Sequence, residues 1–273
     1  MTATKNKVAL IMGVANHRSI AWACAQQFLL NQIQTKEVWD VIVTYQSERF
    51  QSNAHKLISS TPSSSDSTDH NSAGRLLGAL KCNVQTDVPS LFRGQELMDL
   101  LQDRPIHTIV HSIAHAPNLQ NPLLKTSLQD YLEAHHISAF SFLETAQYAQ
   151  PLLHNSSSLI GLTYIGAVRA MPNYHVMGPA KGSLEALIRG LAVEFGHSSG
   201  TRVNAVSAGP LPTLSAKGGI SDFTTLQQQV HQRAPLGNVT QQQVASTVQF
   251  LASDASSGIT GQTLYVDGGY SIT

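Results

Sequence analysis

Charged side chains are scarce in this sequence of 273 residues. They make up 12% of it, and 17 basic residues balance 17 acidic ones, whereas about 25% is usual for a globular protein. A surface with so little net charge exerts little long-range attraction on polyanions. Nucleic acid and anionic membrane surfaces are therefore not expected as partners.

Long apolar runs and cysteines are also few. No run approaches the ~20 apolar residues that a membrane-spanning helix needs, and the opening segment, MTATKNKVAL, does not have the layout of a secretory signal. The two cysteines, Cys24 and Cys82, are too few for a disulfide framework, and both lie in apolar segments that predict burial. These features indicate a globular protein of the reducing cytoplasm.

Metal-binding patterns are missing as well. Twelve histidines are present, but none forms an HxH or HExxH motif. The adjacent His135 and His136 point to different faces of a predicted helix. No metal site is expected.

Short apolar segments alternate with segments of helical periodicity. Strands that are apolar throughout, in this rhythm, are typical of a parallel sheet that helices cover on both faces. The sequence therefore predicts a single doubly wound, Rossmann-like α/β domain over residues 1–273, with a seven-stranded parallel sheet. The predicted strands are residues 7–12, 37–45, 76–84, 106–113, 159–164, 202–207 and 262–266, and the predicted helices are residues 19–30, 128–148, 174–195 and 240–252.

A polar, serine-rich run at residues 59–74, SSTPSSSDSTDHNSAG, interrupts this rhythm between the second and third strands. Because it cannot bury apolar surface, it is predicted to be a surface insertion. Its composition favours a tolerated insertion over a phosphoregulated loop.

The ends of several predicted strands suggest a dinucleotide site. Gly13 follows the first strand, where a residue without a Cβ lets the backbone approach a pyrophosphate. The helix that begins at Ser19 and Ile20 would point its dipole at that phosphate, although a plain strand-to-helix turn gives the same pattern. Small residues also end two later strands, at 111–117 and 207–210, which leaves room for a ribose or a nicotinamide.

The end of the second strand bears on the choice of cofactor. Dinucleotide folds place a residue there that contacts the adenosine ribose. Gln46 is neutral and can bond a 2′-hydroxyl, which favours NADH. Arg49 keeps NADPH open as an alternative.

Tyr174 and Lys181 offer a proton donor next to a cation. They are seven residues apart, which is about 700° around a helix and so within ~20° of one face. An ammonium beside a phenol is expected to lower the phenol's pKa from ~10, and it can also bond ribose hydroxyls. Reduction of a carbonyl or of a conjugated thioester needs such a pair.

With these features the sequence resembles, over nearly its whole length, the NADH-dependent enoyl-acyl-carrier-protein reductases, a branch of the short-chain dehydrogenases/reductases. The Tyr-x6-Lys spacing distinguishes this branch from ordinary members, which use Tyr-x3-Lys; here Val168 and Gly178 stand four residues after Tyr164 and Tyr174. The motifs that carry the resemblance are Gly13 with Ser19-Ile20-Ala21, Thr44-Tyr45-Gln46, His111-Ser112-Ile113, Tyr164, Tyr174, Lys181, Ser207-Ala208-Gly209-Pro210 and Val266-Asp267-Gly268-Gly269.

The resemblance implies hydride transfer from NADH to the β-carbon of a trans-2-enoyl thioester, on acyl-carrier protein or coenzyme A, in type II fatty-acid synthesis. Tyr174 would stabilise the enolate, Lys181 would hold the nicotinamide ribose, and Tyr164 and Ala116 would line the substrate site. A small loop region at residues 213–223 would cover the substrate, and the chain would form a homotetramer. The implied cofactor-binding residues are Gly13, Ser19, Ile20, Gln46, Asn83, Val84, Ser112, Ile113, Lys181, Leu211 and Thr213.

Four positions depart from the family pattern. Asn83 stands where Asp is usual, Ala114 replaces a glycine beside the nicotinamide, and His115 replaces an aromatic residue. Pro212 replaces an arginine near the phosphates, which removes a charge and a backbone N–H. These departures bear on cofactor affinity and substrate range more than on the reaction.

Two other functions compete with this interpretation. A short-chain enzyme acting on a ketone or an alcohol would have Tyr-x3-Lys and a serine about thirteen residues before the tyrosine, but position 161 is glycine. A catalytically silent, dinucleotide-binding regulatory protein would have lost the reacting groups, whereas Tyr164, Tyr174 and Lys181 are all present.

Overall fold

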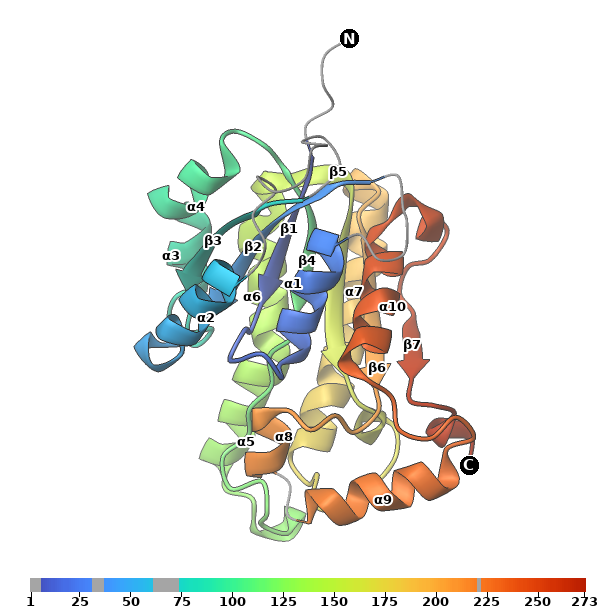
Figure 1. The fold of residues 1–273 in the computed structure, drawn as a ribbon. Helices are drawn as coiled ribbons and strands as arrows, with labels where there is room; N and C mark the ends of the chain where they lie inside the picture. Colours follow the sequence, from blue (N-terminus) through green and yellow to red (C-terminus); the bar gives the residue numbers. More distant parts are fainter. Residues whose placement is uncertain (1–5, 31–36, 61–73, 220–221) are drawn as a thin grey trace.

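The computed structural model describes residues 6–30, 37–60, 74–219 and 222–273. Seven strands form one sheet in the order β3-β2-β1-β4-β5-β6-β7 (Figure 1), and every neighbouring pair is parallel. The doubly wound parallel sheet predicted from the sequence is therefore confirmed. The strands are β1 (Lys7–Met12), β2 (Trp39–Tyr45), β3 (Leu76–Lys81), β4 (Ile106–His111), β5 (Leu153–Thr163), β6 (Arg202–Ala208) and β7 (Thr263–Val266).

Helices connect the strands. The α-helices are α1 (Ile20–Leu30), α2 (Glu48–Ser60), α3 (Val88–Arg93), α4 (Gln95–Leu101), α5 (Leu128–His135), α6 (Ser141–Ala149), α7 (Met177–Ser199), α8 (Leu214–Gly219), α9 (Phe223–Arg233) and α10 (Gln241–Ala252). Short 3₁₀ turns are η2 (Leu123–Lys125), η4 (Gln150–Leu152), η5 (Ile165–Ala167), η6 (Asp254–Ser256) and η7 (Tyr270–Ile272), and η3 (His136–Phe140) is a turn of π-helix between α5 and α6.

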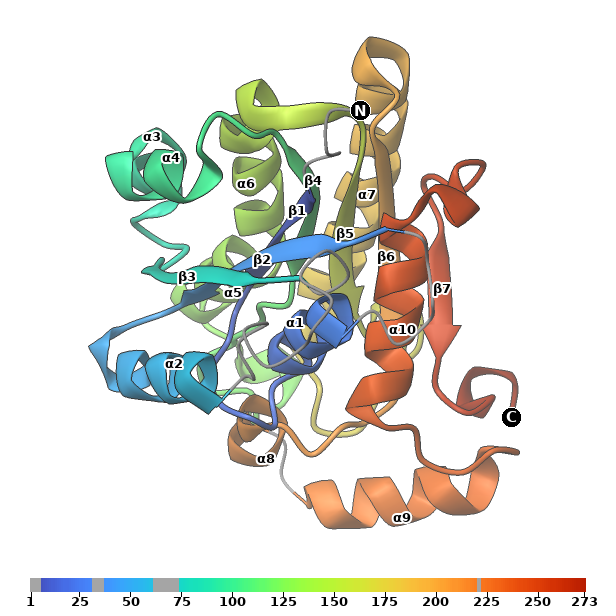
Figure 2. The same cartoon turned by 45° about the horizontal axis from the view of Figure 1, so that its top comes forward.

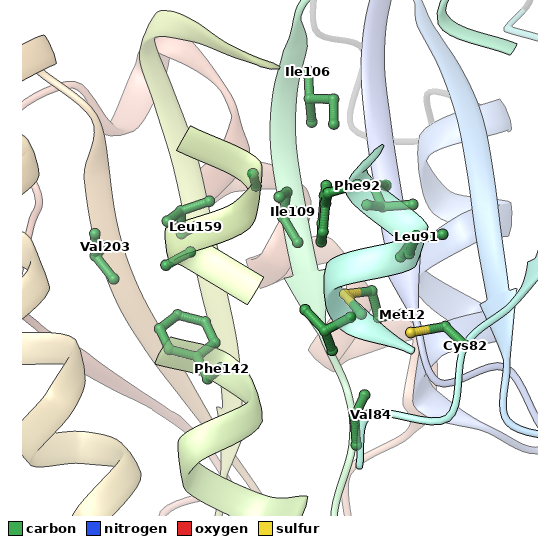
Figure 3. Packing of buried hydrophobic residues seen from close by; sticks show 14 of the residues in the cluster. Met12, Cys82, Val84, Leu91, Phe92, Ile106, Ile109, Phe142, Leu159 and Val203 are labelled. Atoms are coloured by element: carbon green, nitrogen blue, oxygen red, sulfur yellow. The ribbon is translucent and has the colours of Figure 1, made fainter. Parts of the chain in front are cut away.

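The alternation of side chains along β1 shows why its sequence is apolar from Val8 to Met12. Val8, Leu10 and Met12 enter a core cluster with residues of α3, α4, α6 and α7, whereas Ala9 and Ile11 enter a second cluster with α1 and α10. Figure 2 shows these two sets of helices on opposite sides of the sheet. In the first cluster, side chains from the helices, such as Phe142 and Leu91, pack among those from the strands (Figure 3).

The structure corrects two predictions about the strands. The predicted burial of every strand is wrong for β3 and β7, whose residues are mostly half-buried; each is an edge strand with one neighbour. β5 begins at Leu153, six residues before the predicted start at 159. The prediction missed this part of the strand because residues 154–156 are polar and exposed. The short helices α3 and α4 were not predicted.

Most of the serine-rich run at residues 59–74 lies outside the described residues, apart from Gly74 and two serines that end α2. We expect that replacing most of it with a short Gly-Ser linker leaves folding and cofactor binding nearly intact, because a run of this polar composition has few apolar side chains to contribute to a core. Melting temperature and the KM for NADH check this. A fall of several degrees or a tenfold rise in KM would mean that the run is structural.

Candidate active site

A cavity of about 770 Å³ opens at the carboxyl ends of the strands. Residues that follow β1, β4, β5 and β6 line it, together with residues of α7, α8 and α9. Figure 1 shows α8 and α9 beyond the ends of the strands, over this edge of the sheet. The predicted site residues that line the cavity are Gly13, Ser19, Ile20, Ser112, Ile113, Ala116, Tyr164, Tyr174, Lys181, Leu211 and Thr213.

The turn after β1 needs a glycine. Gly13 has a φ of +100°, and a Cβ there would lie 2.4 Å from the Ser112 carbonyl oxygen, so the adjacent turns after β1 and β4 can approach only if this side chain is absent. Ser19 then caps α1: its hydroxyl accepts from the Trp22 N–H at 3.3 Å and donates to the Asn16 carbonyl at 2.7 Å. Gly13 and Ser19 both face the cavity, where a phosphate would meet the positive end of the α1 dipole.

Gly13→Ala should therefore lower the free energy of unfolding by roughly 1–3 kcal/mol and weaken NADH binding. Gly190→Ala is the matched control, because a Cβ at Gly190 in α7 meets nothing within 4 Å; it should gain about 0.5–1 kcal/mol. Urea denaturation measures both. Equal stability of the Gly13 variant and the parent would contradict the strained turn.

Two tyrosines meet in the cavity. The rings of Tyr164 and Tyr174 lie 4.8 Å apart at 66°, and the buried Tyr164 hydroxyl has no hydrogen-bond partner among the described residues. Burial raises the pKa of both phenols, and each is raised further by nearby acidic or phenolic groups. Both therefore keep their protons at neutral pH and can donate. The expectation that Lys181 lowers the pKa of Tyr174 is wrong, because desolvation is the largest influence on this phenol.

The backbone places Tyr174 before the helix rather than on it. The predicted helix start at 174 is wrong by three residues: α7 begins at Met177. Tyr174 lies in the turn between Asn173, whose φ of 57° is left-handed, and the helix. The Tyr174 carbonyl accepts from the Gly178 N–H at 3.1 Å, so this turn leads directly into α7. Tyr174 and Lys181 line the same cavity from a turn and from a helix.

Gly166 is a site residue that the sequence analysis missed. A Cβ at Gly166 would lie 2.4 Å from the ring of Tyr174, so its absence makes space for that ring. The sequence feature that could have revealed Gly166 is its place between two tyrosines that were both predicted to lie in the site.

Lys181 forms hydrogen bonds to the backbone at the ends of two strands. It is 3% exposed, and its Nζ donates to the Leu162 carbonyl at 2.7 Å and to the Ile113 carbonyl at 3.4 Å. Burial lowers its pKa to about 8, and the negative charge of Glu185 opposes that shift. The side chain is thus an ammonium at neutral pH, held at the junction of β4 and β5.

The loop after β4 is fixed by the π-helix η3 and the start of α6. The buried Ser138 hydroxyl accepts from the His115 N–H at 3.0 Å and donates to the His115 carbonyl at 2.9 Å. His111 Nε2 lies 2.9 Å from the Ser141 hydroxyl, and burial lowers the pKa of His111 to about 3, so it is neutral. These polar contacts hold the segment that contains Ser112, Ile113 and Ala116.

Three of the predicted cofactor residues do not line the cavity. Gln46 is exposed after β2, the Asn83 side-chain oxygen accepts from the Gln85 N–H at 3.3 Å, and Val84 is 4% exposed within a core cluster. Their contact with an adenosine stays a prediction. Cys24 and Cys82 are buried and free, as predicted.

The described part of the chain contains no cluster of three or more His, Cys, Asp or Glu side chains that could hold a metal ion. None of the helices that the structure describes is long and apolar enough to cross a membrane.

Comparison with known proteins places this site in a family. The family model described as "Enoyl-(Acyl carrier protein) reductase" matches residues 13–271. The chain is 39% identical to the NADH-dependent enoyl-acyl-carrier-protein reductase FabI of Bacillus subtilis, over 97% of this chain and 95% of the relative. It is 40% identical to the NADH-dependent FabI of a Nostoc species, over 97% of this chain and 96% of the relative. It is 36% identical to the NADPH-dependent FabI of Staphylococcus aureus, over 97% of each chain.

Solved structures agree with these relatives. The Bacillus cereus enoyl-acyl-carrier-protein reductase, in complex with NADP+ and indole naphthyridinone, superimposes with a TM-score of 0.84 at 36% identity, over 100% of this chain and 99% of that one. The Aquifex aeolicus enzyme superimposes with a TM-score of 0.83 at 31% identity, over 98% of each chain. The resemblance drawn from the sequence motifs is thereby confirmed. The chain belongs to the enoyl-acyl-carrier-protein reductase family.

Proposed function

We propose that this protein reduces trans-2-enoyl thioesters carried by acyl-carrier protein, using NADH. The observation that carries the proposal is the convergence of Tyr164, Tyr174 and Lys181 on one cavity at the carboxyl edge of the sheet, in a chain that belongs to this family. The protein is accordingly a nicotinamide-dependent oxidoreductase acting on a CH–CH group.

The residues present fit a nicotinamide dinucleotide. Gly13 leaves room for close approach at the N-terminus of α1, and Ser112, Ile113, Leu211 and Thr213 would surround the rest of the cofactor inside the cavity. Bound NADH would supply the hydride. The neutral Gln46 favours NADH over NADPH, and Arg49, exposed in α2, would allow the second.

Tyr174 would act on the thioester carbonyl. As a hydride adds to the β-carbon, negative charge develops on that oxygen, and a hydrogen bond from a preorganised donor stabilises it. Burial raises the pKa of Tyr174, so its proton stays in place to donate across the neutral range. Lys181 would hold the nicotinamide ribose, and Tyr164, whose hydroxyl has no partner among the described residues, would line the acyl site beside Ala116.

The test is NADH oxidation at 340 nm with crotonyl thioesters of acyl-carrier protein and of coenzyme A, with acetoacetyl thioesters as the comparison and NADPH in parallel. We expect faster oxidation with the crotonyl compounds and with NADH. Preference for the acetoacetyl compound would assign the protein to the ketone-reducing enzymes. NADH binding without turnover would assign it to silent dinucleotide-binding proteins.

The protein is further proposed to be a homotetramer of the cytoplasm. A series of exposed apolar side chains on η2, α5 and η3 supports assembly, because a monomer rarely leaves such a surface in water. Light scattering after size exclusion should give the tetramer mass, and Leu128→Glu should reduce it, whereas Leu30→Glu, another exposed leucine, should not. The series is Leu123, Leu124, Leu128, Tyr131, Leu132 and Phe140, which are 41–101% exposed.

A further inference from the structure

Helix α7 holds the end of β5 at two successive turns. Lys181 donates to the Leu162 carbonyl at 2.7 Å. One turn later, Glu185 accepts from the Thr163 hydroxyl at 2.8 Å. These two bonds fix the two residues of β5 that immediately precede Tyr164.

The carboxylate of Glu185 is unusual in its setting. Glu185 is 6% exposed and Thr163 is 5% exposed, and burial raises the pKa of Glu185. Burying a carboxylate costs free energy that one hydroxyl does not fully return. An apolar side chain would pack there without this cost, so the carboxylate calls for a reason other than packing.

Glu185 faces groups from three parts of the chain. On α7, Lys181 lies one turn before it and Arg189 one turn after it, and both are close enough to affect its charge. Tyr174, from the turn before α7, and Tyr265, from β7, also lie within its field. Lys181 is buried, and its charge helps to lower the pKa of His111 of β4, which is therefore neutral.

We propose that Glu185 is a positioning residue for the cofactor site: through Thr163 it fixes the end of β5, and as a buried carboxylate one helical turn from the buried Lys181 it stabilises the ammonium where the ribose would bind. The part concerning the ribose rests on the proposed function. The part concerning Lys181 concerns the free protein and is independent of it.

The charge has a predicted consequence for pH dependence. Lysine is cationic below its pKa, and that of Lys181 is about 8 with Glu185 in place. Removing the neighbouring negative charge lowers this pKa further, so the ammonium is lost at a lower pH. NADH binding should then weaken at a lower pH than in the parent protein.

The direct measurement is NMR titration of ¹³C-labelled lysine side chains in the ligand-free protein, with Lys181→Arg to assign the resonance. In Glu185→Gln the Lys181 midpoint should fall by at least ~0.5 pH unit. Glu194→Gln, the same change at an exposed position of α7, should leave it unchanged. An unchanged midpoint in Glu185→Gln would overturn the proposal.

NADH fluorescence titrations from pH 6 to 9.5 measure the effect on the site. Glu185→Gln should lose affinity at a lower pH than the parent. Thr163→Val should weaken NADH binding roughly threefold or more at every pH, because the Thr163–Glu185 hydrogen bond is lost while the charge of Glu185 stays. Thr163→Ser, which keeps a hydroxyl, should restore the affinity for NADH. Full affinity in Thr163→Val would refute the positioning role.

Glu185→Asp separates charge from reach. It keeps the charge but shortens the side chain, so the Lys181 midpoint should stay near that of the parent while NADH affinity falls. A midpoint shift equal to that of Glu185→Gln would show that charge is not the cause. Failure of the crotonyl assay with normal NADH binding would reject the proposed reaction and leave these titrations valid.

Discussion

Lys181→Met should raise the dissociation constant of NADH roughly tenfold to a hundredfold, the range expected when a hydrogen bond to a charged group is lost. Methionine fills similar space, so packing is preserved. The melting temperature should fall by only a few degrees, because the loss of the bonds to the Leu162 and Ile113 carbonyls is partly offset by the desolvation free energy that the buried ammonium no longer costs. Fluorescence titration and thermal unfolding measure the two quantities.

The control for Lys181→Met is Lys125→Met, which changes an exposed lysine of η2 that does not line the cavity. It should bind NADH like the parent. If Lys181→Met also binds NADH like the parent, the lysine does not contact the cofactor. If Lys181→Met binds NADH weakly only because much of the variant is unfolded at the temperature of the titration, the lysine has a structural role alone.

Tyr174→Phe should lower kcat by about 10²–10³, the cost of removing one donor to a developing oxyanion. The KM for NADH should change little, since this phenol acts on charge that appears only in the transition state. Steady-state kinetics with crotonyl thioester distinguish these effects. An unchanged kcat would remove Tyr174 from the chemistry.

Tyr131→Phe is the matched control for Tyr174→Phe, because Tyr131 is a 41% exposed tyrosine of α5 that does not line the cavity. Its kcat should equal that of the parent. Thermal unfolding of both variants shows whether either substitution destabilises the fold.

The sheet could be predicted because its central strands are buried on both faces. β1 and β2 are buried over nearly their whole length, and apart from Lys7, Asp40 and Thr44 their residues are largely apolar; largely apolar runs of this kind are a strong signal of parallel strands. The edge strands β3 and β7 carry a weaker signal, and their burial was overestimated. Gly13 and Lys181 could be predicted to line the cavity because Gly13 follows the end of a strand and Lys181 lies on a helix that follows another.

The features that could not be predicted from the sequence depend on contacts between distant segments. The Thr163–Glu185 bond requires the register of α7 against β5, and residue spacing does not encode that register. The pKa of Tyr174 follows from burial, which reverses the shift expected from a neighbouring lysine. The start of α7 at Met177, three residues after the predicted one, depends on the conformation of the turn that contains Tyr174, which the helical periodicity of the sequence does not reveal.

The separate supports of Tyr174 and Lys181 have a consequence for evolution. Lys181 belongs to a long helix that packs along the sheet, whereas Tyr174 belongs to a turn, seated by the space that Gly166 leaves. Changes in the length or composition of that turn can move the phenol without moving the helix. Under the proposed function, the contact to the thioester could therefore change between lineages while the contact to the dinucleotide stays constant, so that the two halves of the proposed reaction could adapt independently.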